Sequence, residues 1–157
     1  MSDAEPDVTG HEVRPVDQRR LVAWMRTSGQ RYFVSGDGTL GGLWNGCVFT
    51  FMIVGQGTVL QVRGQWNRPV AIERRHELIE LLNDRHGRSA WPKCFLLVLD
   101  DGSIRVAADV GVDIRHGLSD SQLDRALRNG VSAGLGVFAE LNDRYPDPVS
   151  TPPESLA

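Results

Sequence analysis

Apolar residues recur along this chain with two different periods, and the changes of period predict its elements. From Asp17 to about Ser28 they recur every three to four positions, which indicates an amphipathic helix with Asp17 as its N-cap. From Arg31 to Ser35 the period shortens to two, as in a β-strand. The segment 36–39 contains two glycines and an aspartate, so it predicts a turn.

Two further strands are predicted in the first half of the chain. The run from about Leu43 to Val54 reads as one long strand that is apolar on both faces, which favours a central or covered position in a sheet. A turn over 55–58 leads into a strand from about Val59 to Trp66. Apolar and polar residues alternate in that strand, so one side of the predicted sheet is wetter than the other.

The second half of the chain predicts two helices and two strands. Its predicted elements are a helix over 72–85, strands over 93–99 and 103–112 joined by an Asp-Asp-Gly turn, and a final helix that opens with a capping box at Ser119 and Gln122 and ends before Pro146. The order α-βββ-α-ββ-α predicts an α+β fold with an antiparallel five-stranded sheet and helices packed on it. We expect one domain over 16–146, a flexible arm over 1–15 and a disordered, proline-rich tail over 147–157.

Composition and charge narrow the classes of function. Hydrophobic residues make up 41% of the 157 residues and charged residues 24%, as in ordinary globular domains. The net charge of -3 and the absence of a basic stripe argue against nucleic-acid binding. No apolar run reaches the length of a membrane span, and the acidic N-terminus does not resemble a signal peptide, so we expect a cytoplasmic protein.

The sequence contains no convincing catalytic or cofactor-binding motif. Gly36 to Gly41 matches G-x-G-x-x-G, but a strand follows it where a dinucleotide site requires a helix, so turn glycines are the better interpretation. The histidines lack the spacing of a zinc pair, and no nucleophile elbow is present. Cys47 and Cys94 lie in apolar runs and are expected to be buried, reduced thiols. We therefore predict no catalytic residue, no cofactor and no metal site.

Tryptophans provide the best candidates for a binding surface. Trp44 opens one predicted strand and Trp66 closes the next, while Trp91 precedes another. Tryptophan is enriched at binding hot spots, so we take these three and Met52 as candidate contacts for a protein or peptide partner. The alternative is that the indoles close the ends of the sheet.

Two glycines, which have no side chain, lie in the interior of the last predicted helix. Gly130 and Gly134 each cost about 1 kcal/mol relative to alanine in a helix interior, and close approach of another backbone would offset that cost. They are candidate dimer contacts, with packing on the chain's own sheet as the alternative.

An ordered set of motifs resembles the YbjN family in its actinobacterial form. The motifs are Tyr32, Asp37-Gly38, Trp44, Val62-Arg63-Gly64-Gln65-Trp66, Trp91-Pro92-Lys93, Asp100-Asp101-Gly102 and Gly117 leading into the helix from Leu118 to Tyr145. The resemblance spans roughly 16–146. The chain departs from the family where Thr39 replaces a second acid and where Arg85 stands in place of a tryptophan.

The resemblance implies both a fold and a role. The family is similar in fold to type III secretion chaperones, and it implies a non-enzymatic, peptide-binding, chaperone-like module or sensory transduction regulator. We expect a cytoplasmic homodimer, because apolar second faces on two predicted strands are costly to leave in water. The alternative is a small-molecule-binding regulator or a cryptic enzyme, whose site would be a pocket with converging polar groups of perturbed pKa.

Overall fold

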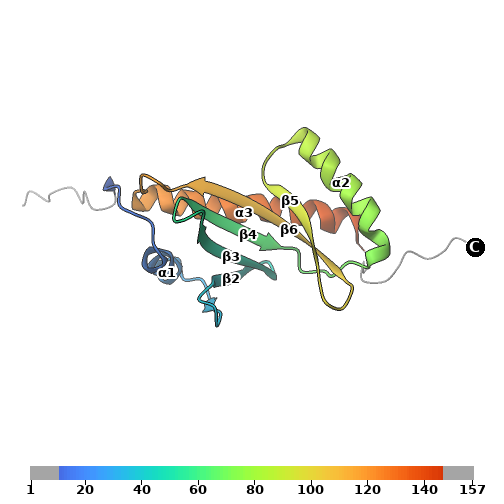
Figure 1. Cartoon of the computed structure of the whole chain (residues 1–157), viewed down its shortest axis with the longest axis horizontal. Coiled ribbons are helices and arrows are strands. Elements are labelled where there is room, and N and C mark those ends of the chain that lie inside the picture. The colour runs from blue at the N-terminus through green and yellow to red at the C-terminus, as the bar shows by residue number, and fades with distance from the viewer. Residues whose placement is uncertain (1–10, 147–157) are drawn as a thin grey trace, which may run out of the picture.

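A computed structural model describes residues 11–146, which form three α-helices, one 3-10 turn and a single sheet. In chain order the elements are α1 (Gln18–Thr27), β1 (Tyr32–Val34), β2 (Leu40–Trp44), β3 (Cys47–Val54), β4 (Val59–Gln65), η2 (Ile72–Arg74), α2 (Arg75–Arg88), β5 (Lys93–Val98), β6 (Ile104–Asp113) and α3 (Asp120–Arg144) (Figure 1). The α+β class and the antiparallel pairing predicted from the sequence are confirmed. The expected tail over 147–157 and most of the expected arm lie outside the described residues.

The sheet has six strands, so the prediction of five was wrong. Its order is β1-β2-β3-β4-β6-β5. The run predicted as one strand is divided between β2 and β3 by a turn at Asn45 and Gly46, whose φ angles are 50° and 75°. Asn-Gly is the residue pair that two-residue hairpins prefer, because both positions of that turn require a positive φ. The chain therefore has the order α-ββββ-α-ββ-α.

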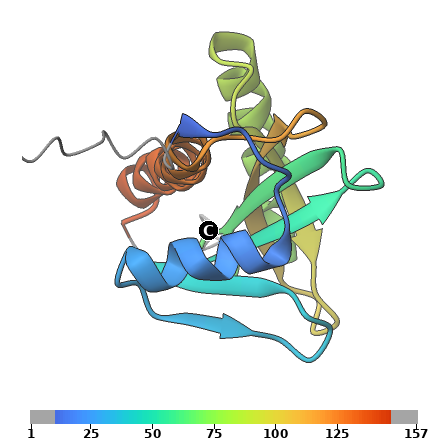
Figure 2. The same ribbon diagram turned by 90° about the vertical axis from the view of Figure 1, so that its left-hand side faces the viewer.

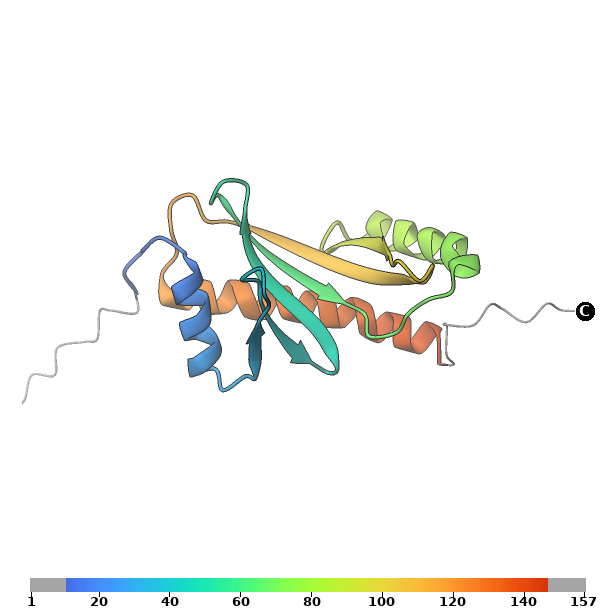
Figure 3. The same ribbon diagram turned by 60° about the horizontal axis from the view of Figure 1, so that its bottom comes forward.

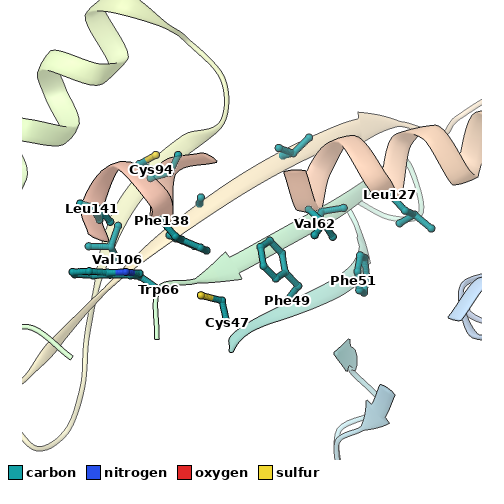
Figure 4. Packing of buried hydrophobic residues seen from close by; sticks show 14 of the residues in the cluster. Cys47, Phe49, Phe51, Val62, Trp66, Cys94, Val106, Leu127, Phe138 and Leu141 are labelled. Atoms are coloured by element: carbon teal, nitrogen blue, oxygen red, sulfur yellow. The ribbon is translucent and has the colours of Figure 1, made fainter. Parts of the chain in front are cut away.

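The sheet curls around α1 and α3, so that both helices lie on its concave side (Figure 2). Alternate residues of β3 and β4 point toward α3, including Phe49 and Val62, which are buried. Phe49 meets Phe138 of α3 with ring centroids 6.0 Å apart, and Figure 4 shows both rings in the layer between sheet and helix. The opposite side of β3, β4 and β6 is covered by no helix of the described chain.

The helix termini follow the sequence signals. Asp17 accepts a hydrogen bond of 2.9 Å from the Arg20 N–H at the start of α1. Ser119 and Gln122 form the predicted capping box at the start of α3, with bonds of 3.2 Å and 2.8 Å. Arg14, which falls in the segment expected to be an arm, exchanges backbone hydrogen bonds with Leu118.

α2 lies along β5, the strand at one edge of the sheet (Figure 3). Leu78 and Leu82 are its buried residues. Arg85 reaches from α2 to Glu140 of α3 at 3.2 Å, and the Tyr145 hydroxyl donates to Glu77 at 3.2 Å. No helix among residues 11–146 has the length and apolar character needed to cross a membrane.

Candidate functional site

The convex side of the sheet, here called the open face, is the first candidate site. Register fixes which side chains share it, because residues directly opposite each other in neighbouring strands point to the same side. Leu43 lies opposite Val48, and Phe33 belongs to the row that continues through Thr50 to Arg63. The apolar members of the open face include Phe33, Leu43, Val48, Met52 and Phe95.

The β1–β2 end of the open face is the most exposed part. Phe33 lies across Gly41, where a Cβ would collide with its ring, and it leaves 42% of its surface exposed. Leu43 is 57% exposed. Two large apolar side chains in one exposed area are the usual mark of an interaction surface, whereas single exposed hydrophobics are common and carry no such meaning.

A charged pair occupies the centre of the open face. The Arg63 guanidinium on β4 donates two hydrogen bonds of 2.8 Å to the Asp109 carboxylate on β6. Gln61 donates a third bond of 2.8 Å to the same carboxylate, and the Arg63 guanidinium lies 4.9 Å from the centre of the Phe95 ring. The hydrogen bond to Asp109 raises the pKa of Arg63. This bidentate geometry fixes both charges in place beside the Phe95 ring.

A groove between α1 and α3 is the second candidate site. It has a volume of about 450 Å³ and contains Arg14, Arg19, Arg20 and Trp24 on one side and Asp120 on the other. An adjoining groove of about 300 Å³ is lined by Trp24 and Trp44 together. We refer to the two as the α1–α3 groove. The sequence places Trp24 on the apolar face of the first helix, but it does not indicate that part of the indole ring remains accessible.

Hydrogen bonds order the walls of the α1–α3 groove. Arg20 donates to the Leu118 carbonyl and to Asp120, each at 2.9 Å, and Arg20 is the main cause that lowers the pKa of Asp120. The Trp24 indole N–H donates to Asp124 at 2.9 Å, and this bond is the main cause that lowers the pKa of Asp124. Both acids are therefore fixed as carboxylates at neutral pH.

The four partner-binding candidates from the sequence fall in four different places. Trp44 is half-buried in the α1–α3 groove, with its ring centroid 5.7 Å from those of Phe49 and Phe51. Trp66 is completely buried, so its indole belongs to the core and not to the surface. Trp91 is 48% exposed next to β5. Met52 lies on the open face opposite Gln61.

Trp66 does not lie beside Trp44, because the hairpin register pairs Trp44 with Cys47 instead. The Trp66 indole N–H donates to Asn142 of α3 at 3.0 Å, which satisfies the polar atom of this core residue.

The two glycines predicted as dimer contacts face their own sheet. Gly130 and Gly134 are both buried, the first against Val62 and the second against Phe49. Their small size is therefore used within the chain, as the alternative interpretation held. The prediction of a dimer receives no support from them.

The cysteines and histidines occupy structural positions. Cys47 and Cys94 are free thiols on β3 and β5, with two strands between them, and burial raises the pKa of both. The His86 ring accepts a 3.0 Å hydrogen bond from the Cys94 N–H. His76 pairs with Glu80 at 3.1 Å where both side chains are largely exposed. Among residues 11–146 no cluster of three potential metal ligands occurs.

A family model and solved structures are similar to this chain. The model of YbjN, described as "Putative bacterial sensory transduction regulator", matches residues 17–143. The crystal structure of YbjN, "a putative transcription regulator from E. coli", aligns with a TM-score of 0.72 and 16% identity over 85% of this chain and 96% of that one. No curated protein sequence matches the chain significantly.

Two further solved structures are more distant. An uncharacterized protein from Methanothermobacter thermautotrophicus aligns with a TM-score of 0.56 and 14% identity, over 83% of this chain and 99% of that one. A chain of the HopA1-SchA chaperone-effector complex aligns with a TM-score of 0.49 and 14% identity, over 82% and 99% of the two chains. At such identities these similarities concern the fold alone, and the last of them is too low to carry an argument.

Proposed function

The chain belongs to the YbjN family, and from that premise we propose that it is a non-enzymatic module that binds a protein or peptide partner through the open face, in a regulatory or chaperone-like role. The observation that carries this proposal is the uncovered convex side of the sheet with Phe33 and Leu43 exposed on it. Removal of apolar surface from water contributes about 25 cal/mol per Å², from which the entropic costs of association are subtracted.

The centre of the open face supports recognition of a specific partner. Arg63 and Asp109 hold each other in a fixed geometry, so the ordering of these side chains is complete before a partner arrives. Their remaining polar atoms, with those of Gln61, provide directional contacts for a partner beside the apolar end of the open face. Met52, predicted from the sequence as a contact, belongs to this surface, and its flexible thioether can adapt to a partner.

The titratable groups support a binding role over an enzymatic one. General acids need carboxyl pKa values raised toward neutrality. The shifted carboxyl groups of the described chain all move the other way, held as carboxylates by hydrogen bonds and arginines; they are Asp37, Asp101, Asp113, Asp120 and Asp124. A buried acid beside His76 or His116 would have favoured an enzyme, but the partner of His76 is the exposed Glu80.

The test uses charge placed on the open face. Phe33→Lys combined with Leu43→Lys should abolish capture of the cognate partner from the native cell, while the fold persists because both residues are exposed. Val34→Lys is the matched control, since Val34 neighbours Phe33 on the same strand, points to the other side and is 54% exposed. The captured polypeptide should then bind the purified wild-type protein and the Val34→Lys control, but not the double variant. Equal loss with the control, or no loss with the double variant, would reject the open face.

The proposal extends to a cytoplasmic homodimer. Free thiols such as Cys47 and Cys94 persist in a reducing compartment, which agrees with the cytoplasm. The exposed apolar residues of the open face motivate the dimer, because a second copy is one way to remove them from water. Sedimentation equilibrium at micromolar concentration measures it, and a monomer there would remove this part of the proposal.

A small-molecule-binding regulator is the second candidate, and the α1–α3 groove favours it. The larger of its two parts has a volume of about 450 Å³, which suits a compact ligand, and there Trp24 with Arg19 offers an aromatic surface beside a cation. Mass spectrometry of material released from the denatured, natively purified protein distinguishes the two candidates. Reproducible recovery of a metabolite without any polypeptide would favour the groove.

A further inference from the structure

β5 is an edge strand, and the outer backbone groups of its second half are unused. It is the last strand of the sheet and pairs with β6 alone. The Leu99 N–H donates to Ser103 across the hairpin, whereas the Cys94 N–H points the other way, to His86. Because N–H directions alternate along a strand, the N–H and C=O groups of Leu96 and Val98 point to the free edge. Within residues 11–146 no hydrogen bond reaches them.

Edge strands with such groups are normally protected, and from Cys94 to Val98 the protection is limited to the helix α2 beside the strand. Charged side chains, prolines or bulges usually blunt an edge. From Cys94 to Val98 every residue is apolar, the pairing with β6 is regular, and Val98 is 66% exposed. The edge is therefore suited to pairing with another strand.

α2 forms a wall along this edge and leaves a groove of about 300 Å³ beside the strand, here called the β5–α2 groove. Its sides are Ile79, Leu82 and Asn83 from the helix and Leu96 and Val98 from the strand. It therefore combines apolar side chains from both elements with free backbone donors and acceptors along one side, which is the arrangement that accepts an extended peptide by strand addition.

One end of the β5–α2 groove carries a positive charge. His86 fixes the end of α2 at Cys94, so Arg75, eleven residues earlier and about 16 Å along the helix, lies toward Val98. Arg75 is exposed and has no ion pair within residues 11–146. A carboxylate on the ligand would complete this end of the groove.

We propose that the β5–α2 groove binds an extended peptide segment that adds to β5 as a seventh strand, with apolar residues at alternate positions facing α2 and an acidic residue facing Arg75. The inference rests on the proposed function as a binding module and adds a second site with its ligand class. A second copy of the chain fits less well, because its own β5 would bring its own α2 against the α2 that lines this groove.

The experiment uses the full chain and fluorescent octapeptides that alternate valine and threonine, with a glutamate at one end or the other. Fluorescence anisotropy should show saturable binding by one of the two. N-methylation of every second residue should abolish binding in one frame and leave it unchanged in the other, because only one frame donates to Leu96 and Val98. Amide hydrogen exchange at these two residues should slow by at least tenfold when the peptide is bound.

Substitutions in α2 test the charge of Arg75 and the apolar side of the β5–α2 groove at Ile79. Arg75→Glu should weaken binding of the glutamate peptide at least tenfold and improve binding of a peptide ending in lysine. Arg88→Glu is the matched control, since it makes the same charge change on the same helix but lies outside the groove, and it should leave both affinities unchanged. Ile79→Asp should abolish binding of either peptide while the thermal midpoint shows that the variant remains folded.

Three outcomes would overturn this inference. They are no binding of any alternating peptide, equal tolerance of both N-methylated frames, and a native dimer that Ile79→Asp splits, which would assign the groove to a second copy. Any of these outcomes, found together with capture of a cognate partner that only the open-face double variant abolishes, would remove the groove and leave the proposed function standing.

Discussion

Gly130 on α3 faces Val62 on β4 so closely that a Cβ added to the glycine would lie 2.9 Å from the Cβ of Val62. This contact sets the distance between the last helix and the centre of the sheet. The same helix carries a second close approach, since a Cβ at Gly134 would lie 2.7 Å from the Phe49 ring.

Gly130→Ala should destabilise the protein by about 1 kcal/mol. The substitution gains about 1 kcal/mol in helix propensity but forces either the helix or Val62 to shift, and overpacking of this kind costs about 1–3 kcal/mol. Urea unfolding measures the difference. Gly136→Ala is the matched control: nothing lies within 4 Å of its added methyl group, so it should stabilise by about 0.5–1 kcal/mol. Stabilisation by both substitutions would contradict the close approach.

Asp109→Ala should cost about 2 kcal/mol, because it leaves the half-buried Arg63 guanidinium without its two hydrogen bonds. The double variant with Arg63→Ala should cost less than the sum of the two single variants by about 1 kcal/mol. A double-mutant cycle from urea unfolding measures this coupling. The exposed pair Arg115 and Asp113 is the control, and its coupling should stay below about 0.5 kcal/mol. Strict additivity at Arg63 and Asp109 would show that the open face has no fixed centre.

Asp37 should titrate at a pKa of about 2, well below the ordinary aspartate value of about 3.9, because the Ser35 hydroxyl and the Thr39 N–H donate to its carboxylate. A carboxyl pKa that is lower in the folded state stabilises the protein above the unfolded value, and the contribution disappears as the pH falls through about 2. Carboxyl-carbon chemical shifts follow this titration. Ser35→Ala should raise the pKa, and an unchanged curve would contradict the hydrogen bond.

Cys47 and Cys94 should resist thiol reagents in the native protein at neutral pH. Burial raises the pKa of both thiols, and the thiolate is the reactive form. Reaction with Ellman's reagent should be slow in buffer and complete for two thiols in denaturing urea. Rapid release of colour from the native protein would place at least one thiol at an accessible surface.

Local sequence signals predicted most of the elements but missed one hairpin turn, and with it one strand. The capping residues Asp17 and Ser119 act as predicted, because caps depend on residues a few positions away. The apolar run from Leu43 to Val54 hid the Asn45-Gly46 turn, since alternation continues on both sides of a two-residue hairpin. A search for Asn-Gly pairs within apolar runs would have found the sixth strand.

The candidate sites depend on the pairing register of the strands, which cannot be read from a single sequence. Arg63 and Asp109 are 46 positions apart and meet only because β4 pairs with β6 in one particular register. Trp44 and Trp66 each stand at the end of a predicted strand, and the sequence does not distinguish them. In the structure Trp44 lines a groove, whereas Trp66 is fully buried. Residue type indicated the kind of contact, while the tertiary packing decided which tryptophan is accessible.

The described chain enters and leaves at opposite ends of α3, whose 25 residues span about 37 Å. Arg14 is bonded to Leu118 just before the helix, and Tyr145 just after it contacts Glu77 of α2. The chain can therefore be immobilised in two orientations. A support attached ahead of Arg14 leaves the α2 side free for analytes, whereas one attached beyond Tyr145 crowds it.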